Sequence, residues 1–580
     1  MNLIEDAKRQ IDALISEAYS RAAEAGELPQ GAVLTGTVEI PREARNGDYA
    51  ANHAMAGAKA LRSAPRKIAE TLLRHIEMDG SYFKSAEAAG PGFMNFRLGD
   101  KWYADVLAAV ESEGGGYGRT DSLKGQRILV EFVSANPTGP MHMGNARGGV
   151  LGDALAEVLS CAGAEASREV YVNDAGNQIE KFALSIEARY IQLIKGEDAV
   201  VFPEDAYHGD DIRELARLFR EENGDGWLDR PGDERRAAMA QFGLEHNLPK
   251  MKSDLERYKI CYDRWFCESE LHEAGEVARA VEELGRRGYT YEKDGAVWLS
   301  TSKIMAEGLL AAGKTQEEID ALELKDDVLR RANGVYTYFA ADIAYHRNKL
   351  EERGFDKAID IWGADHHGHV ARLKAALDAL GLDGTHRLDI VLMQLVRLMR
   401  DGEVVRMSKR TGKAISLSDL LDEVPVDAAR YFFNSRPDSQ MDFDLGLAVR
   451  QDSENPVYYV QYAHARICTL MENLAGEGLS PCAAGEADMG LLTGEHEREL
   501  IKQLALMPEE IRLAARDYNP SRVNAYVTEL AARYHRFYNA CRIKGEAEET
   551  ARARLLLCLC VRRVIENCLN IIGVTAPTHM

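Results

Sequence analysis

The sequence lacks the features of a membrane or secreted protein. No stretch of its 580 residues approaches the roughly 20 apolar residues that a membrane-spanning helix needs. Its nine cysteines form no paired CxxC knuckles and no spacing typical of disulfide frameworks. The first 25 residues form an amphipathic pattern and lack the apolar core of a secretion signal. We therefore predict a cytoplasmic protein without a structural zinc ion.

Positive charge is also scarce. The chain has 71 Lys and Arg against 93 Asp and Glu, a net charge of −22, which argues at first against a nucleic-acid partner. Two local clusters of Lys and Arg nevertheless carry positive charge. An acidic protein with basic stripes suits one structured RNA, whereas the alternative is a set of solvated helix faces, and charge alone leaves both open. The clusters are Arg397, Arg400, Arg406, Lys409, Arg410 and Lys413, and then Arg533, Arg536, Arg542, Lys544, Arg552, Arg554, Arg562 and Arg563.

The composition is that of a folded protein with several domains. Hydrophobic residues make up 46% and charged residues 28%, without low-complexity tracts. Domains of roughly 100–200 residues would give three or four of them. Residues 1–117 mix helix with short strands, at 33–39 and 93–98, and end in a Gly-rich run that is a plausible boundary. We predict an α+β N-terminal domain there.

An α/β pattern begins at Arg127. A buried strand at 128–133 leads through a Pro- and Gly-rich loop into a helix with apolar residues from Val150 to Leu159, and Gly163 ends this helix. A second strand, 168–172, follows and ends in Asn173 and Asp174. Strand, helix and strand in this order predict a parallel sheet with a right-handed crossover.

The remaining chain alternates between helical and α/β patterns. Residues from about 200 to 330 are polar and helix-rich, and they look like an insertion between two halves of one sheet. We predict an α/β domain at 118–453 with this insertion, and a separate all-helical bundle at 454–580. The α/β pattern resumes at 335–340, 358–362 and 389–396.

The first motif with chemical content is SANPTGPMHMGNARGG, residues 134–149, between a strand and a helix. A Gly-containing loop that leads into a helix N-terminus offers backbone N–H groups to phosphates. Pro137 and Gly139 fix the turn, His142 can reach a phosphate oxygen, and Gly144 lets a flat base approach the backbone. For His142 alone, the alternative is a loop histidine satisfied by its neighbours.

The second motif is VVRMSKRTGKAISL, residues 404–417. Its cations Arg406, Lys409, Arg410 and Lys413 suit a mobile clamp for polyphosphate, because placed positive charge supplies much of the rate in nucleotidyl transfer. A basic loop by itself is more often a solvated turn. The two motifs together, in this order, favour the clamp.

HMGN at 142–145 resembles the HIGH signature of class I aminoacyl-tRNA synthetases, and RMSKR at 406–410 resembles their KMSKS loop. The string around HMGN is similar to the arginyl subgroup in particular. The resemblance spans essentially the whole chain. It implies an N-terminal domain that touches the tRNA elbow, a Rossmann catalytic domain, an inserted connective domain and a helical anticodon-binding domain of the DALR kind. Further matches are GDYAANHA, AGPGFMNFRL, NDAGNQI, YHGDDI, TYFAADIAYHRNK, WGADHHGH and the closing GVTAPTHM.

The resemblance implies a two-step reaction. ATP activates L-arginine, with Mg²⁺ as a substrate ion and no tightly bound cofactor or metal, and arginine is then esterified to tRNA(Arg). Catalysis falls to His142, Asn145 and Lys409. We expect a monomer without membrane contact. The implied ATP contacts are Pro137, Gly139, His142, Gly144, Asn145, Gly363, Asp365, Met407, Ser408 and Lys409.

The chain departs from both signatures. Asn145 replaces the second His of HIGH, so this side chain can donate a hydrogen bond but cannot carry positive charge. Arg406 and Arg410 replace the first Lys and the last Ser of KMSKS. Some arginyl enzymes lack the second Lys and carry one just upstream of HIGH instead. No Lys stands there in this chain, so Lys409 is expected to keep the role.

A guanidinium is best met by a carboxylate with an aromatic or amide group beside it. Tyr338 and Asp342 are four residues apart and would share one face of a helix. Glu131, Ser134 and Asn136 lie where a substrate amino group would enter. The resemblance makes all five arginine contacts and leaves open which end of arginine each one holds. The alternatives are an ion pair of Glu131 with a structural Arg, and a helix-start charge at Asp342.

Two rival functions are weighed against this one. A non-catalytic relative would bind tRNA or a partner protein without turnover, and the presence of both His142 and Lys409 disfavours it. Another class I ligase, such as a cysteinyl type, would need thiol or zinc ligands near the HMGN loop. The sequence has no suitable cysteine cluster there.

Overall fold

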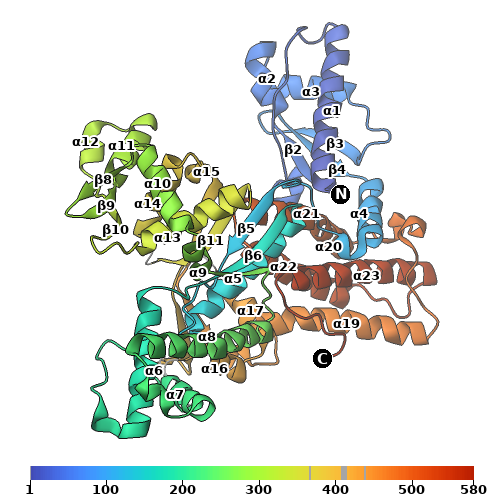
Figure 1. The fold of residues 1–580 in the computed structure, drawn as a ribbon. Helices are drawn as coiled ribbons and strands as arrows, with labels where there is room; N and C mark the ends of the chain where they lie inside the picture. The colour runs from blue at the N-terminus through green and yellow to red at the C-terminus, as the bar shows by residue number, and fades with distance from the viewer. Residues whose placement is uncertain (1, 365–366, 406–414, 437–438) are drawn as a thin grey trace.

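The computed structural model describes residues 2–364, 367–405, 415–436 and 439–580. A central α/β body carries an N-terminal domain at one end, two lobes on the opposite side and a helical bundle beside it (Figure 1). Among the described helices, none is long and apolar enough to cross a membrane. The predicted combination of a parallel-sheet domain, an α+β N-terminal domain and an all-helical C-terminal bundle is confirmed.

The N-terminal domain packs helices on an antiparallel sheet of order β1-β2-β4-β3. The predicted strand at 93–98 is confirmed, but the one at 33–39 is wrong except for its last two residues. Gly36 packs so closely on His53 that a Cβ there would lie 2.4 Å from the ring, so the chain runs against a helix. The elements are α1 (Leu3–Glu24), β1 (Val38–Glu39), β2 (Tyr49–Ala51), α2 (His53–Leu61), α3 (Pro65–His75), β3 (Phe83–Ala89), β4 (Phe93–Leu98) and α4 (Asp100–Glu113).

The central sheet has five parallel strands in the order β12-β11-β5-β6-β7. Its strands are β5 (Arg127–Glu131), β6 (Glu165–Val172), β7 (Arg264–Cys267), β11 (Lys357–Gly363) and β12 (Leu388–Met393). Helix α5 (Met143–Cys161) joins β5 to β6 and ends as expected, with Gly163 at φ 99°. The chain starts in the middle, moves outward to β7 and returns to the other side of β5. The switch point between β5 and β11 is where such sheets bind ligands.

Apolar side chains cover both faces of this sheet. Ile128, Val130 and Ile359 belong to one hydrophobic core, whereas Ala358 and Leu388 belong to another. Consecutive residues of β11 therefore face opposite layers, which is typical of a doubly wound fold.

Two lobes leave the sheet, and between them the chain returns to it. The first lobe has its own core and consists of α6 (Asn177–Lys195), α7 (Asp210–Asn223) and α8 (Gly232–Arg257). Strand β7 then pairs with β6, so residues 200–330 do not form one continuous insertion. The second lobe contains α9 (Glu268–Glu273), α10 (Glu276–Arg286), β8 (Thr290–Lys293), β9 (Ala296–Leu299), α11 (Thr301–Ala311), α12 (Gln316–Asp320) and β10 (Asp327–Arg330).

The segment after the second lobe differs from the expected strand at 335–340. Thr337 accepts a hydrogen bond from the Ala340 N–H and starts helix α13 (Tyr338–Arg347), which continues into a π-helical turn (Asn348–Glu352). The strand expected at 389–396 is two strands, because β12 ends at Met393 and β13 begins at Val396. The other elements here are α14 (His367–Ala379), α15 (Gly384–Arg387), β13 (Val396–Arg400), β14 (Glu403–Val405), α16 (Leu417–Glu423), α17 (Val426–Asn434), β15 (Met441–Asp444) and α18 (Leu445–Ala448).

The C-terminal bundle is all helical, as predicted, but it is not separate in its packing. One continuous core runs from the N-terminal domain through the sheet into the bundle. Tyr117 donates a hydrogen bond to the Leu504 carbonyl, and the fully buried Arg430 donates to the Ile572 carbonyl. These parts therefore support one another. The helices are α19 (Pro456–Gly476), α20 (Glu495–Ala505), α21 (Met507–Arg516), α22 (Ser521–Ala540) and α23 (Glu548–Ile571).

Candidate active site

The HMGN motif forms the N-terminus of α5 at the switch point of the sheet. His142 is the extended residue that precedes the helix, and its side chain is exposed. The Asn145 N–H donates to the His142 carbonyl. A Cβ on Gly144 would meet no atom within 4 Å, so a ligand has room to approach the backbone there. The positive end of the α5 dipole lies at the same place as the open space beside Gly144, which favours binding of a phosphate there.

The last residues of the second motif, 415–417, lie beside the first motif. The Met143 N–H donates to the Ile415 carbonyl, and the Leu417 N–H donates to the Met141 carbonyl. The chain that leaves residues 406–414 thus pairs directly with the HMGN segment. Four predicted contacts lie outside the described residues: Asp365, Met407, Ser408 and Lys409.

Four of the six described ATP-contact candidates line one or the other of two cavities. Gly139 and His142 line one of about 550 Å³, together with residues of α8 and α16. Asn145 and Gly363 line another of about 410 Å³ at the carboxyl ends of β5 and β11. Pro137 is buried, and its carbonyl accepts a hydrogen bond from Asn247 on α8, so Pro137 holds the loop in place.

The smaller cavity brings together three of the five predicted arginine contacts: Glu131, Ser134 and Asp342. Helix α13 places Tyr338 one turn before Asp342, as the spacing predicted. Tyr338 is 46% exposed at the helix start, and neither it nor the exposed Asn136 is part of the described cavity lining. The structure therefore does not bring these two residues into the cavity lining with the other three.

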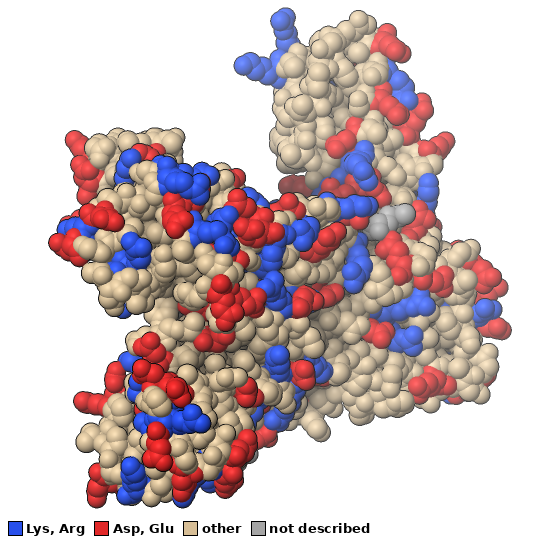
Figure 2. All heavy atoms as spheres, viewed as in Figure 1, with Lys and Arg blue, Asp and Glu red and all other residues tan. Residues whose placement is uncertain are grey.

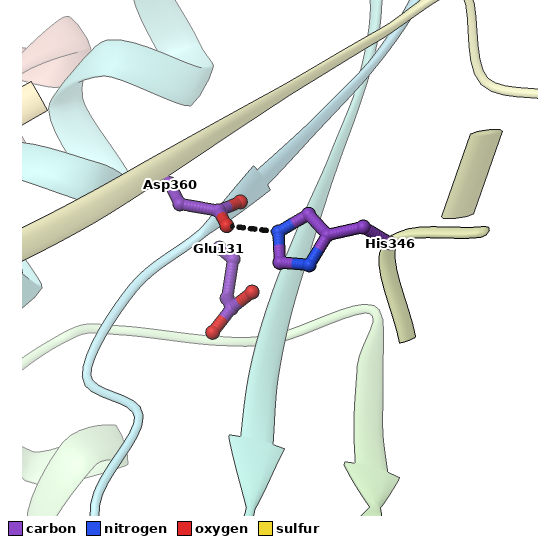
Figure 3. A group of neighbouring side chains, drawn as sticks. All are labelled: Glu131, His346 and Asp360. Carbon is purple, nitrogen blue, oxygen red and sulfur yellow. Dashed lines mark hydrogen bonds and ion pairs between the residues drawn. The ribbon is translucent and has the colours of Figure 1, made fainter. Parts of the chain in front are cut away.

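Glu131 belongs to a buried charge network. It pairs with the Lys349 ammonium and accepts a hydrogen bond from the Ser134 hydroxyl. Lys349 also lies 2.8 Å from Asp360, whose other oxygen lies 2.7 Å from His346 Nε2. Figure 3 shows the contact between Asp360 and His346, with Glu131 beside them. The alternative considered for Glu131 was an ion pair with a structural Arg, and the structure shows an ion pair with Lys349 instead.

The same three side chains resemble a metal site by distance alone, because one ligand atom of each lies within 4.8 Å of the others. However, Lys349 contacts both carboxylates, so an ammonium already supplies the positive charge. Burial would raise the pKa of Asp360, but Lys349 and His346 outweigh it and lower the pKa to about 2. Burial would likewise lower the pKa of Lys349, and Asp360 and Glu131 raise it. Asp360 and Lys349 are thus held as an ion pair, whereas burial raises the pKa of Glu131 in spite of its contact with Lys349.

Asp342 has a different environment. Its Oδ2 lies 2.8 Å from His369 Nε2, and 35% of its side chain is exposed to the cavity and solvent. The sequence analysis missed His369 as a site residue, although it lies in the WGADHHGH motif. It also missed Glu268, a buried carboxylate that is hydrogen-bonded to the cavity residue Tyr171 and whose pKa burial raises. Only the spatial neighbours of these residues identify them.

The surface charges are mostly paired within the chain. Figure 2 shows basic and acidic side chains interspersed over the visible face. In the C-terminal cluster, Arg533 pairs with Glu499 and Glu529, and Arg554 pairs with Glu497. For these arginines, the structure favours the reading as paired helix faces over a basic stripe.

Comparisons with known proteins cover the whole chain. Three family descriptions match: "Arginyl tRNA synthetase N terminal domain" at 8–98, "tRNA synthetases class I (R), catalytic domain" at 107–445, and "DALR anticodon binding domain" at 460–580. The chain is similar to the arginine–tRNA ligases of Acetivibrio thermocellus and Caldanaerobacter subterraneus, each 50% identical over 580 residues and all of both chains.

Solved structures agree. A putative arginyl-tRNA synthetase from Campylobacter jejuni is 33% identical with a TM-score of 0.73, over 83% of this chain and all of that one. The Thermus thermophilus arginyl-tRNA synthetase, 21% identical, has the same fold with a TM-score of 0.71, over 99% of this chain and all of that one. Because the class I (R) catalytic domain matches residues 107–445 and relatives 50% identical match over the full length, this chain belongs to the arginyl-tRNA synthetase family.

Proposed function

We propose that the chain activates L-arginine with ATP and transfers it to the 3′ end of tRNA(Arg). The observation that carries this proposal is the end-to-end match with arginine–tRNA ligases at 50% identity, and the sequence contains both the HMGN and the RMSKR motifs. The cavity at the switch point of the parallel sheet supports it, since substrates of such sheets bind there.

In the first step, a carboxylate oxygen of arginine attacks the α-phosphorus of ATP. A new bond joins this oxygen to the α-phosphorus. The bond from the α-phosphorus to the oxygen that bridges the α- and β-phosphates breaks, and pyrophosphate leaves. Mg²⁺ accompanies ATP as a substrate ion. The N-terminus of α5, His142, Asn145 and Lys409 would stabilise negative charge on the phosphates.

In the second step, a ribose hydroxyl of the terminal adenosine attacks the carbonyl carbon of the mixed anhydride. The ester bond forms, AMP leaves with the electron pair of the broken bond, and the hydroxyl proton is released. No described side chain is required as a covalent partner in either step. Positioning and electrostatics therefore carry the rate.

We assign recognition of the guanidinium to Asp342, with Tyr338 one helical turn before it. The carboxylate of Asp342 reaches the cavity, and its protein partner is a histidine rather than a fixed cation. A planar guanidinium can satisfy both carboxylate oxygens, whereas a lysine ammonium is a point charge. Ser134 and Asn136 would then serve the α-amino end. Glu131, whose charge Lys349 already balances, would act there by holding the Ser134 hydroxyl in place.

The proposed contact with tRNA falls on the helical bundle. Tyr458 and Tyr462 stack in parallel on α19, with ring centroids 6.2 Å apart, and Tyr462 is 39% exposed. Flat exposed rings of this kind accept nucleic-acid bases by stacking. We also propose a cytoplasmic monomer, to be tested by the mass in solution.

The test is an assay of ATP–pyrophosphate exchange and aminoacylation that offers each of the twenty amino acids with total tRNA. Charging of tRNA with arginine alone is expected. Charging with cysteine or methionine would overturn the substrate assignment. Tight tRNA binding without turnover would instead indicate the non-catalytic relative.

A further inference from the structure

The cavity residue His369 makes the direct protein contact to the side chain that we assign to the guanidinium. His369 lies in the first turn of α14, and its Nε2 lies 2.8 Å from Asp342 Oδ2 on α13. Both side chains line the 410 Å³ cavity. Because histidine Nε2 is a donor in one neutral tautomer and an acceptor in the other, the effect on Asp342 depends on the second ring nitrogen.

Arg372 determines that tautomer. Its Nη2 lies 3.4 Å from His369 Nδ1. A guanidinium has only donors and stays protonated, so Nδ1 must face it with a lone pair. The ring proton is then on Nε2 and is donated to Asp342. In this tautomer the ring donates a hydrogen bond without adding a charge, which leaves the carboxylate of Asp342 available to an incoming cation.

Arg372 is itself held in place. Its Nη1 lies 2.5 Å from Asp327 Oδ1 on β10, and Asp327 Oδ2 accepts a hydrogen bond from the Thr301 hydroxyl. The His369 ring is packed edge-on to Phe339 at 5.3 Å and lies 5.7 Å from Trp362. These contacts restrict the rotation of the ring. The series Asp327, Arg372, His369 and Asp342 thus links the second lobe to the cavity.

We propose that His369 is a positioning residue for arginine recognition, which fixes the plane of the Asp342 carboxylate while leaving its charge unneutralised. Arg372 and Asp327 set the tautomer that makes this possible. The inference rests on the proposed arginine-charging function. Asp342 Oδ2 then accepts one hydrogen bond from a neutral donor. The other lone pairs of the carboxylate remain available to accept from the planar guanidinium.

The test compares two substitutions at position 369 in the full-length enzyme. His369→Phe keeps a ring against Phe339 and Trp362 and removes the donor. His369→Gln keeps an N–H at nearly the same place and removes the ring. We expect His369→Phe to raise the KM for arginine about tenfold, with kcat and the KM for ATP within about twofold, and His369→Gln to stay within about threefold of wild type for all three.

A double-mutant cycle separates positioning from packing. If His369 acts through Asp342, then Asp342→Asn with His369→Phe should have the same arginine KM as Asp342→Asn alone. The proposal would be overturned if the increases in arginine KM of Asp342→Asn and His369→Phe multiplied in the double variant. It would also be overturned if His369→Phe had the wild-type KM for arginine, or if His369→Phe and His369→Gln lost the same affinity and both had a lowered Tm. The matched control is His386→Phe, an exposed histidine 2.7 Å from Asp383 on α15 and not part of the cavity lining.

Aminoacylation by the wild-type enzyme in the same assay distinguishes a failure of the proposed function from a failure of the role proposed for His369. If the wild type does not charge tRNA with arginine, the proposed function fails and the variants have no bearing on it. If the wild type charges arginine and His369→Phe matches it, only the role of His369 is overturned.

Discussion

Glu131 and Asp342 are carboxylates on the same cavity, yet the fold gives them different partners. The Glu131 side chain is 7% exposed and pairs with a Lys349 ammonium that is fully buried. The Asp342 side chain is 35% exposed and meets a histidine that we infer to be neutral. A carboxylate with its own internal cation is a poor receptor for a second cation, because its charge is already balanced. Asp342 is therefore the better partner for a guanidinium.

The difference also predicts what each residue does for stability. Breaking a buried ion pair by removing one partner leaves an uncompensated charge, whereas a half-exposed charge can be solvated. The Glu131 network should therefore matter more for folding, and Asp342 more for substrate affinity. Stability measurements test the role of the Glu131 network, and substrate kinetics test the role of Asp342.

The largest effect is expected from Lys349→Met. This change removes the cation shared by Glu131 and Asp360, and it should lower the free energy of unfolding by about 3–5 kcal/mol. Urea unfolding followed by circular dichroism measures it. A Lys349→Met protein as stable as wild type would show that the network is not held as ions.

The matched control is Lys357→Met. Lys357 lies 2.7 Å from Asp389 on the same sheet, but the two side chains are 27% and 29% exposed. Solvent can replace the lost contact, so the loss should be about 1 kcal/mol or less. Equal losses for the two lysines would remove the contrast between buried and exposed pairs.

The sequence was sufficient for the elements with strong local signals. The strand before HMGN, helix α5 and its ending at Gly163 follow from apolar periodicity and the backbone freedom of glycine. It was insufficient for β7, which has four residues and lies within a polar helical region. So short a strand carries little periodic signal, and only pairing with β6 stabilises it.

The site shows the same division. The motifs identified Glu131 and Asp342 as candidates, but the partners that set their roles are distant in the chain. Lys349 is 218 residues from Glu131, and His369 is 27 residues from Asp342. No local pattern in one sequence encodes such pairings. The sequence alone could therefore not predict which end of arginine each carboxylate holds.

The next largest effect concerns the phosphate end, where neither carboxylate should contribute. Lys409→Ala should lower the rate of ATP–pyrophosphate exchange by about 10²–10³, which is typical for one lost contact to transition-state charge. The KM for arginine should change little. Near-normal exchange would contradict the assignment, and Arg410 and Lys413 would be tested next.

A smaller effect is expected from Asp342→Ala. It should raise the KM for arginine at least tenfold and narrow the preference for arginine over lysine and canavanine, since the bidentate partner is lost. Asp342→Asn should be intermediate, because the amide keeps one acceptor and loses the charge. Steady-state aminoacylation with all three amino acids measures this. Unchanged KM and selectivity in a folded variant would make Glu131 the guanidinium partner after all.

The smallest effect should come from a substitution of Ser134, which contacts Glu131 and lines the same cavity as Asp342. Its hydroxyl donates to Glu131 and still has lone pairs to accept from a substrate ammonium. Ser134→Ala removes one neutral acceptor at the α-amino end, which is worth about 0.5–1.5 kcal/mol, so the KM for arginine should rise only about two- to tenfold. Ser134→Thr keeps the hydroxyl and serves as the control.

The selectivity of the Ser134 variant is the sharper readout. Arginine and lysine share the same α-amino group, so a defect at that end should weaken both substrates by the same factor. The ratio of their kcat/KM values should then stay constant, in contrast to Asp342→Ala, where it should fall. A changed ratio in Ser134→Ala would mean that the hydroxyl reaches the side chain of the substrate. Glu131, held through this same hydroxyl, would then lie at the guanidinium end as well.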